Sequence, residues 1–284
     1  MKFKFLPVIM ILVLSVTGCE FFFNIPSTSQ GPTVVDPIIV DQPEDPSSPA
    51  RLVISFGAGE MKIAPGAEGL VSGSASYNVP DFKPEVSQTG NTVKITQGNY
   101  QLNKVPNFGK IINQWDLKIG TTPIDLEINA GAYQANLELG DLAITNLSVK
   151  DGASDVKLSF SSPNRTEMNL LRYETGASQV TLSGLSAANF SMLEFKGGAG
   201  NYTLDFSGDL RRNASVSINA GLGNLTIIIP ELLPVQLTVD GSLANINMSN
   251  GWSRDGNTYT QAGSGPMLTM VVEIGAGNLV VTNP

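Results

Sequence analysis

Apolar and polar residues alternate on both sides of a glycine-rich segment in the middle of the chain, from Leu193 to Phe206. On the N-terminal side the apolar positions include Leu193 and Phe195, and on the C-terminal side they include Tyr202 and Leu204. A period of two residues is the spacing of a β-strand with one buried face, because successive side chains point to opposite sides of a sheet. The segment therefore predicts two short strands joined at glycine.

The same pattern recurs along most of the chain. Aligned on Gly198, the equivalent anchor positions are Gly57, Gly131, Gly152, Gly176, Gly198, Gly221, Ser242 and Gly275. Between Gly131 and Ser242 the steps are about 20 to 24 residues, which is a repeat length typical of solenoids. Strands that recur on the same side of a stack must run parallel, and such connections are right-handed as a rule. The prediction is an all-β fold: a right-handed parallel β-solenoid (β-helix) of about 20–24-residue repeats, with hairpin insertions near both ends.

Three residues after each anchor the chain carries a polar residue. These eight positions, the predicted polar ladder, are Glu60, Gln134, Asp155, Gln179, Asn201, Asn224, Asn245 and Asn278. Stacking in register would place them about 4.8 Å apart, and amides can both donate and accept hydrogen bonds along such a column. Two interpretations stay open: a structural ladder at the turn, and a row that binds a ligand. The neighbouring glycine suits a position with positive φ or one where another backbone passes close.

The N-terminus has the features of a bacterial export signal. Lys2 and Lys4 precede an apolar run from Phe5 to Val16, which is shorter than the roughly 20 residues that span a bilayer but suits a signal-peptide core. The four residues Val16-Thr17-Gly18-Cys19 resemble the lipobox of bacterial lipoproteins, in which the cysteine is lipidated and becomes the first residue of the mature protein. We therefore expect residues 1–18 to be a signal peptide and Cys19 to be lipidated; a cleaved secretory signal with an incidental cysteine is the alternative. Cys19 is the only cysteine, so no intramolecular disulfide can form.

Residues 19–50 are expected to form a disordered tether. This stretch is rich in proline, acidic, and free of Lys and Arg, a composition that cannot bury enough apolar surface to fold. Residues 51–284 are then expected to form one β-solenoid domain. The interval from Ile63 to the second repeat should be a hairpin-bearing cap at one end, with Trp115 in the core or the cap, and residues 249–265 should form a second excursion near the other end. The last repeat, Met270 to Val281, closes the chain.

Several phrases of the sequence point to a family. The repeated glycine unit, NQWDLKIG at 113–120, GGAGNYTLDFSG at 197–208 and the final GAGNLVV at 275–281 resemble the toast-rack domains of bacterial envelope proteins. These domains are relatives of the extracytoplasmic part of LiaF-type cell-envelope stress regulators and of adhesin-head-like β-solenoid domains. The resemblance covers about residues 51–284 and implies a β-solenoid outside the cytoplasm, with no catalytic residues to transfer. The chain differs from the LiaF-type arrangement in having a lipoprotein signal in place of several transmembrane helices.

Composition excludes several kinds of chemistry. The chain has no histidine, so Ser-His-Asp catalysis and His-based metal sites are impossible, and no P-loop or dinucleotide signature is present. We expect no cofactor and no metal. The net charge is −8, and removal of Lys2 and Lys4 with the signal leaves −8 − 2 = −10, which argues against nucleic acid as a partner.

A carbohydrate-active enzyme is the main alternative to a binding protein. A β-helix lyase or hydrolase would need clustered carboxylates with arginine or lysine in one groove. The candidates are Asp155, Glu174 and Asp205, with Arg165, Arg172, Arg211 and Arg212. They fall at outward or turn positions of different repeats, where ordinary solvated charges explain them better than a catalytic role, and no enzyme activity is expected.

The sequence thus predicts a protein that is extracytoplasmic and attached to the cell membrane through a lipid on Cys19. It would serve as a binding, scaffolding or adhesion module of the cell envelope, with an envelope protein or a glycan as its partner. An accessory sensor in cell-envelope stress signalling is a further alternative. The sequence does not distinguish the inner from the outer membrane.

Overall fold

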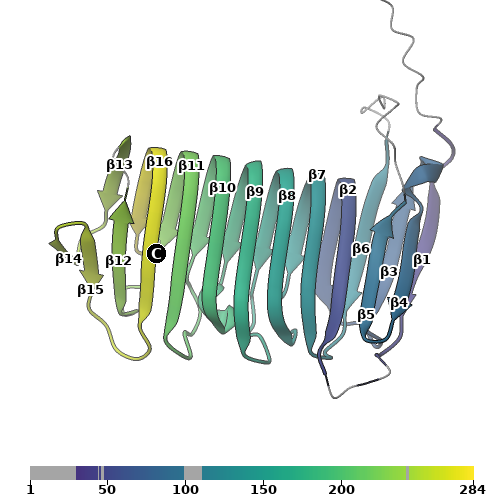
Figure 1. The fold of residues 1–284 in the computed structure, drawn as a ribbon, viewed down its shortest axis with the longest axis horizontal. Helices are drawn as coiled ribbons and strands as arrows, with labels where there is room; N and C mark the ends of the chain where they lie inside the picture. The colour runs from purple at the N-terminus through teal and green to yellow at the C-terminus, as the bar shows by residue number, and fades with distance from the viewer. Residues whose placement is uncertain (1–29, 44, 46–47, 99–110, 241–242) are drawn as a thin grey trace, which may run out of the picture.

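Strands make up almost all of the regular structure. The computed structural model describes residues 30–43, 45, 48–98, 111–240 and 243–284. The described residues contain the short 3-10 helices η1 (Pro80–Phe82) and η3 (Leu185–Ala188), and they contain no helix long and apolar enough to cross a membrane. The strands form one mixed sheet and stand side by side in an elongated row (Figure 1). The all-β prediction is therefore confirmed.

Long parallel strands form the centre of this row. They are β2 (Ala50–Pro65), β7 (Ile124–Glu138), β8 (Ile144–Ser159), β9 (Met168–Ser183), β10 (Phe190–Asp205), β11 (Ala214–Ile228) and β16 (Leu268–Thr282). Each contains one of the anchor glycines near its middle, and the ribbons fold over at one edge of the molecule (Figure 1). We call the residues before the anchor the first half of the strand and those after it the second half.

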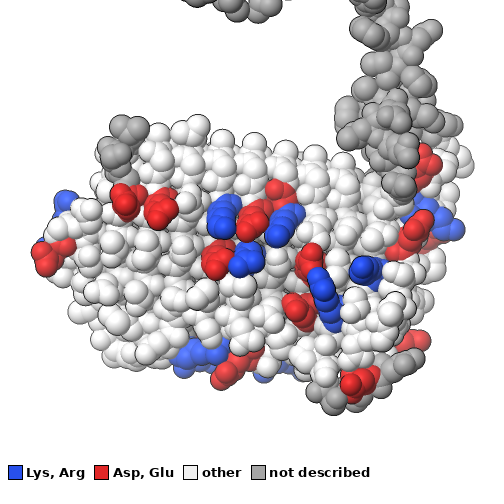
Figure 2. Space-filling model, in the orientation of Figure 1, with Lys and Arg blue, Asp and Glu red and all other residues white. Residues whose placement is uncertain are grey.

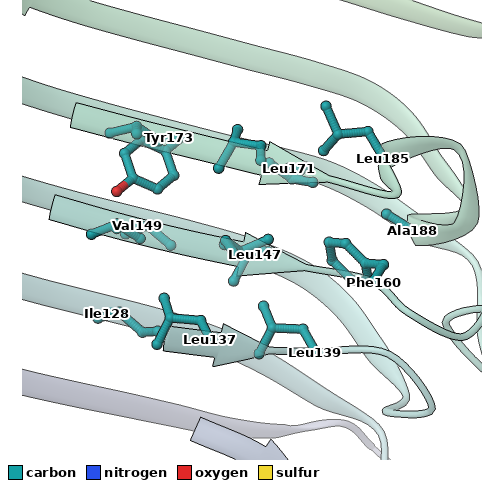
Figure 3. Packing of buried hydrophobic residues seen from close by; sticks show 14 of the residues in the cluster. Ile128, Leu137, Leu139, Leu147, Val149, Phe160, Leu171, Tyr173, Leu185 and Ala188 are labelled. Atoms are coloured by element: carbon teal, nitrogen blue, oxygen red, sulfur yellow. The ribbon is translucent and has the colours of Figure 1, made fainter. Parts of the chain in front are cut away.

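The core lies between the two halves. In β10, Leu193 and Phe195 of the first half and Tyr202 and Leu204 of the second half are all at most 2% exposed. Equivalent residues of successive strands stack in columns, as Ile128, Val149 and Tyr173 do in Figure 3. Because a fully buried large side chain stabilises a fold by about 1.5–3 kcal/mol, these columns supply the main driving force for stacking.

The strand order in space differs from the order in the chain at the C-terminal end. The last strand, β16, lies between β11 and the earlier strands β12 (Val235–Asp240) and β13 (Leu243–Met248). Val216 of β11 pairs with Met270, which in turn pairs with Leu237 of β12. The last repeat therefore closes the chain but is not the end of the stack.

Split strands replace the bent strands at both ends of the row. At one end β5 (Thr92–Gln97) pairs with the first half of β2, and β6 (Asn113–Ile119) pairs with its second half. At the other end β12 and β13 pair with the two halves of β16. Ser242, one of the predicted anchors, falls in the break between β12 and β13, outside the described residues.

Antiparallel strands cover the outer sides of these split strands, so the sheet is mixed and not purely parallel. At the N-terminal end β1 (Val34–Val40) pairs with β3 (Val71–Tyr77), β3 pairs with β6, and β4 (Pro84–Thr89) pairs with β5. At the other end β15 (Thr258–Gln261) pairs with β12, and β14 (Trp252–Asp255) pairs with β15. Trp115 of β6 is 1% exposed and packs edge-on against Phe56 at 5.1 Å.

The predicted tether needs a correction. Residues 34–40 were assigned to a disordered segment, yet they form β1, in which Ile38 and Val40 are buried. The reason is that the segment Val34–Val40 pairs with β3, so its backbone is hydrogen-bonded and the side chains of Ile38 and Val40 leave water. Cys19 and the predicted signal peptide lie outside the described residues.

Candidate binding surface

The anchor glycines form a column along the folded edge of the stack. A Cβ atom on Gly198 would lie 2.4 Å from the carbonyl oxygen of Gly176, and one on Gly176 would lie 2.5 Å from that of Gly152. The same close approach recurs at Gly131 over Gly57, Gly152 over Gly131, Gly221 over Gly198 and Gly275 over Gly221. None of these anchors has a positive φ. Glycine is needed at these positions because the backbone of the adjacent strand in the stack occupies the space that a side chain would fill.

The structure brings the eight residues of the polar ladder into one column. The paired positions run from Glu60 to Gln134, Asp155, Gln179, Asn201, Asn224, Asn278 and finally Asn245. All eight are exposed. Asn224 Nδ2 donates to Asn201 Oδ1 at 2.8 Å, and Asn278 Nδ2 donates to Asn224 Oδ1 at 2.7 Å.

Sequence reasoning missed a ninth member of this column. Gln114 of β6 pairs with Glu60, and its Nε2 donates to Glu60 Oε2 at 3.0 Å. The alternation of Gln114 with the buried Trp115 and Leu117 could have identified it, but no glycine anchor precedes it at the usual distance. At this end of the row the two halves are the separate strands β5 and β6, with no anchor glycine between them, so the repeat is hard to recognise.

A second outward column runs parallel to the ladder, two residues further along each strand. Its central members are Thr181, Thr203 and Thr226, which are paired in register on β9, β10 and β11. Over β9, β10 and β11 the two columns give the second-half face a surface of amides and hydroxyls, and on β16 the second column continues with Val280. Charged residues of these two columns are found towards the N-terminal end, at Glu60, Lys62, Asp116, Asp155 and Lys157.

The first-half face differs from the second-half face in its charge, because acidic and basic side chains gather on it in a band (Figure 2). Arg172 lies 2.8 Å from Glu194, and Glu174 lies within 4.0 Å of Arg172, Lys150 and Lys196. Further along, hydrogen bonds from Asn129 and Arg51 lower the pKa of Glu127. These pairs are largely exposed, so each contributes little to stability.

The candidate catalytic carboxylates are not brought together with the arginines in one groove. Glu174 belongs to the ion-pair band, whereas Asp155 is a ladder residue on a second half. Asp205 accepts a hydrogen bond from the backbone of Ser207 at the end of β10. Arg165 pairs with Asp141, Arg212 pairs with Glu167, and Arg211 is exposed. The candidate residues named from the sequence therefore do not form one catalytic groove.

A polar cluster lies just inside the folded edge. Asp151 of β8 accepts hydrogen bonds from the hydroxyl of Tyr173 at 2.7 Å and from that of Thr175. Tyr133 of β7 lies at 3.5 Å from the same carboxylate. Burial, with the nearby negative charge, raises the pKa of Tyr173 and Tyr133 well above the ordinary value, so both stay protonated and able to donate. The cluster ties three neighbouring strands together.

A crevice of about 1660 Å³ lies at the interrupted corner between β5 and β6. It is lined by the residues around the anchor glycines of β2, β7 and β8 and by Phe82, Gln97 and Asn113. Gln97 Oε1 accepts from the backbone of Gly57 at 2.8 Å, and Asn113 Nδ2 donates to the carbonyl of Ala58 at 2.6 Å. These side chains satisfy backbone groups that a continuous neighbouring strand would otherwise pair. No feature of the sequence had indicated the crevice.

Solved structures in which the chain follows a similar path match this protein at low sequence identity. A proposed cell adhesion protein from Clostridium sporogenes is 19% identical, with a TM-score of 0.44 over 89% of this chain and 100% of its own. A proposed adhesin from Bacteroides fragilis is 11% identical, with a TM-score of 0.41 over 90% and 99%. A proposed lipid binding protein from Parabacteroides distasonis is 9% identical, with a TM-score of 0.38 over 89% and 98%. No curated protein matches the chain.

A family profile covers most of the folded part. It is described as the N-terminal domain of toast_rack, DUF2154, and it matches residues 30–182 and 163–228. The matched residues run from just before β1 to the end of β11 and so include the column of anchor glycines from Gly57 to Gly221. The chain belongs to the toast-rack family, as the glycine units predicted.

Proposed function

We propose that the protein is a lipid-anchored extracytoplasmic module that serves in binding, scaffolding or adhesion at the cell envelope. The observation that carries this proposal is the exposed polar ladder, held in register along the whole second-half face from Glu60 to Asn245. A repeated row of hydrogen-bonding groups on a stiff support is suited to contact with a partner, because little conformational entropy is lost when they bind.

The anchoring part of the proposal rests on the N-terminus. Lys2, Lys4, the apolar run and the lipobox-like residues before Cys19 support export and lipidation. Lipidation with more than one acyl chain would hold the protein durably at a membrane surface. The stack, with the right-handed coil expected of parallel connections, would then stand outside the cytoplasm, joined to Cys19 by the segment that precedes β1.

Site-specific photocrosslinking in cells tests the binding role. A photoreactive group replaces Thr181 or Lys157 on the second-half face, and Ser217, exposed on the first-half face, serves as the control. We expect adducts to one protein or to glycan from the second-half positions, and far fewer from Ser217. If neither second-half position yields adducts above background, the binding proposal is wrong.

A further inference from the structure

Part of the second-half face carries no charge. On β9, β10 and β11 the two outward columns consist of amides and hydroxyls, and on β16 they consist of Asn278 and the half-buried Val280. We call these residues the neutral strip: Gln179, Thr181, Asn201, Thr203, Asn224, Thr226, Asn278 and Val280. The strip borders Asp155 and Lys157 on β8, and on β10 it is followed by Asp205, two residues after Thr203. The other broad face, over the same strands, carries the ion-pair band (Figure 2).

The absence of charge limits the chemical classes of ligand that the strip can bind. The strip itself carries no charge, although the chain as a whole is at −8. A charged ligand placed on the strip would lose hydration and meet no opposite charge in return, which is unfavourable. The strip is complementary to a ligand that is polar but neutral.

The amides of the strip are held in one orientation. Because Asn278 donates to Asn224, and Asn224 donates to Asn201, each donor uses one of its two N–H groups along the column. The second N–H group of each is left for a partner. These free groups repeat at the strand spacing of about 4.8 Å, and the threonine hydroxyls repeat beside them about 6.6 Å away, two residues along each strand. A ligand that itself repeats on this length scale could use all of them at once.

A narrow apolar border follows the amide column on the side of the folded edge. It is formed by Ala177, Ala199, Leu222 and Ala276, of which Leu222 is 59% exposed. The three alanines keep most of this border flat, and the exposed Leu222 adds an apolar side chain on β11. Sugar rings have apolar faces and hydroxyl-bearing edges, so they match a surface that is apolar along one side and lined by amides and hydroxyls along the other.

We propose that the neutral strip binds an uncharged, extended, β-linked polysaccharide that lies along the stack, across β9, β10, β11 and β16. The proposal rests on the binding function proposed above and names the chemical class of its ligand. Extended β-1,4-linked glycans are flat ribbons whose ring spacing is close to the strand spacing. Neighbouring rings of such a ribbon are flipped relative to each other, so every second ring meets every second strand in the same way.

A sedimentation assay with insoluble glycans tests the proposal. The full chain, purified in detergent, is mixed with particles of cellulose, chitin and mannan, and with a polygalacturonate gel as the anionic comparison. The test variant is Thr226→Lys, and the matched control is Ser217→Lys, which places the same charge on the same strand β11 but on the first-half face next to Glu194. Melting temperatures of both variants show whether each is folded.

We expect the unmodified chain to sediment with at least one neutral glycan and not with polygalacturonate. Thr226→Lys should weaken that binding about tenfold or more, because the lysine side chain removes one hydroxyl of the column and sterically blocks its neighbours. Ser217→Lys should leave glycan binding unchanged. Absence of binding to every neutral glycan, or binding that a folded Thr226→Lys retains, would overturn the ligand assignment. If no neutral glycan binds but Thr181 crosslinks to a protein partner, the ligand assignment is wrong and the binding function is retained. If there is neither glycan binding nor a crosslinked partner, the binding function is wrong as well.

Discussion

At the residue scale, stacking of the bent strands depends on the column of anchor glycines, where neighbouring backbones come into close contact. The alternation around Gly198 locates the bend, and positive φ or close backbone approach would both require glycine there. The structure shows that close approach decides, since the carbonyl of Gly176 occupies the place of a Cβ atom. A sequence read one repeat at a time cannot show this, because the constraint comes from the neighbouring strand.

We predict that Gly198→Val destabilises the domain by about 1–3 kcal/mol, since the new Cβ would overlap the carbonyl oxygen of Gly176 and force the strands apart. The matched control is Ala199→Val, which introduces the same side chain at the adjacent, exposed position of β10. Thermal unfolding followed by circular dichroism measures both. Equal melting temperatures for the two variants would contradict the close-packed column.

Glu138 gives the fold a pH-dependent contact at the turn after β7. Burial raises the pKa of its carboxyl, but hydrogen bonds from Ser159, the Ser161 backbone and the Gly140 backbone outweigh burial and lower it overall. A carboxyl whose pKa is lower in the folded state contributes stability at pH values above its ordinary pKa of 4.5, and that contribution is lost as the pH falls.

We therefore predict that Glu138→Gln lowers the free energy of unfolding at pH 7 by about 1 kcal/mol, because a neutral acceptor forms weaker hydrogen bonds. Below pH 4.5 the difference from the unmodified protein should shrink. Urea unfolding at several pH values measures it, with Glu231→Gln at an exposed position as the control. A difference that stays constant from pH 7 to pH 3 would show that the carboxylate charge has no part in the turn.

At the scale of elements, the sequence predicts much of the architecture. Period-two alternation locates both halves of the central strands, and the common spacing of Asn201, Asn224 and Asn278 from their anchors places them opposite one another. Three features were not predicted: strand β1 within the supposed tether, the split strands at both ends, and the insertion of β16 between β11 and β12. All three depend on pairing between segments far apart in the chain, which local periodicity does not report.

The insertion of β16 makes the stability of earlier strands depend on the last one. Leu279→Ala in β16 removes a fully buried side chain and should cost about 2–5 kcal/mol. We predict that backbone amides of β12, β13 and β15 then exchange with deuterium faster, although these strands precede β16 in the chain. Leu237→Ala in β12 is the control, because it should loosen β12 and β15 while β16 keeps its pairing with β11. Unchanged exchange in β13 after Leu279→Ala would contradict the strand order.

At the scale of the whole molecule, two faces of different chemistry are carried by one stack. The first halves present an ion-pair band (Figure 2), and the second halves, on the opposite face, present the polar ladder and the neutral strip. The sequence shows which residues are polar and which alternate, so the outward columns were predictable in part. Their division into a charged and an uncharged face becomes visible only once both halves are folded over each other.

Attachment to a membrane is tested at this scale as well. We predict that Cys19→Ser leaves the protein soluble or unprocessed, because without the thiol no acyl chain can be added. Cell fractionation with immunoblotting of the full chain measures this, and Gly198→Val serves as a control for effects of folding alone. A processed Cys19→Ser chain that remains in the membrane fraction would refute the lipid anchor.

The central claim is that the bent strands stack in one register, with β16 inserted so that the polar ladder is a single column. Pairs of cysteines in a Cys19→Ser background test it directly, since strand neighbours about 4.8 Å apart can form a disulfide and second neighbours cannot. The structure predicts rapid oxidation of Asn224→Cys with Asn278→Cys and of Asn278→Cys with Asn245→Cys, but not of Asn224→Cys with Asn245→Cys. Efficient oxidation of the last pair, with failure of the other two, would show that the repeats stack in chain order and would contradict the column described above.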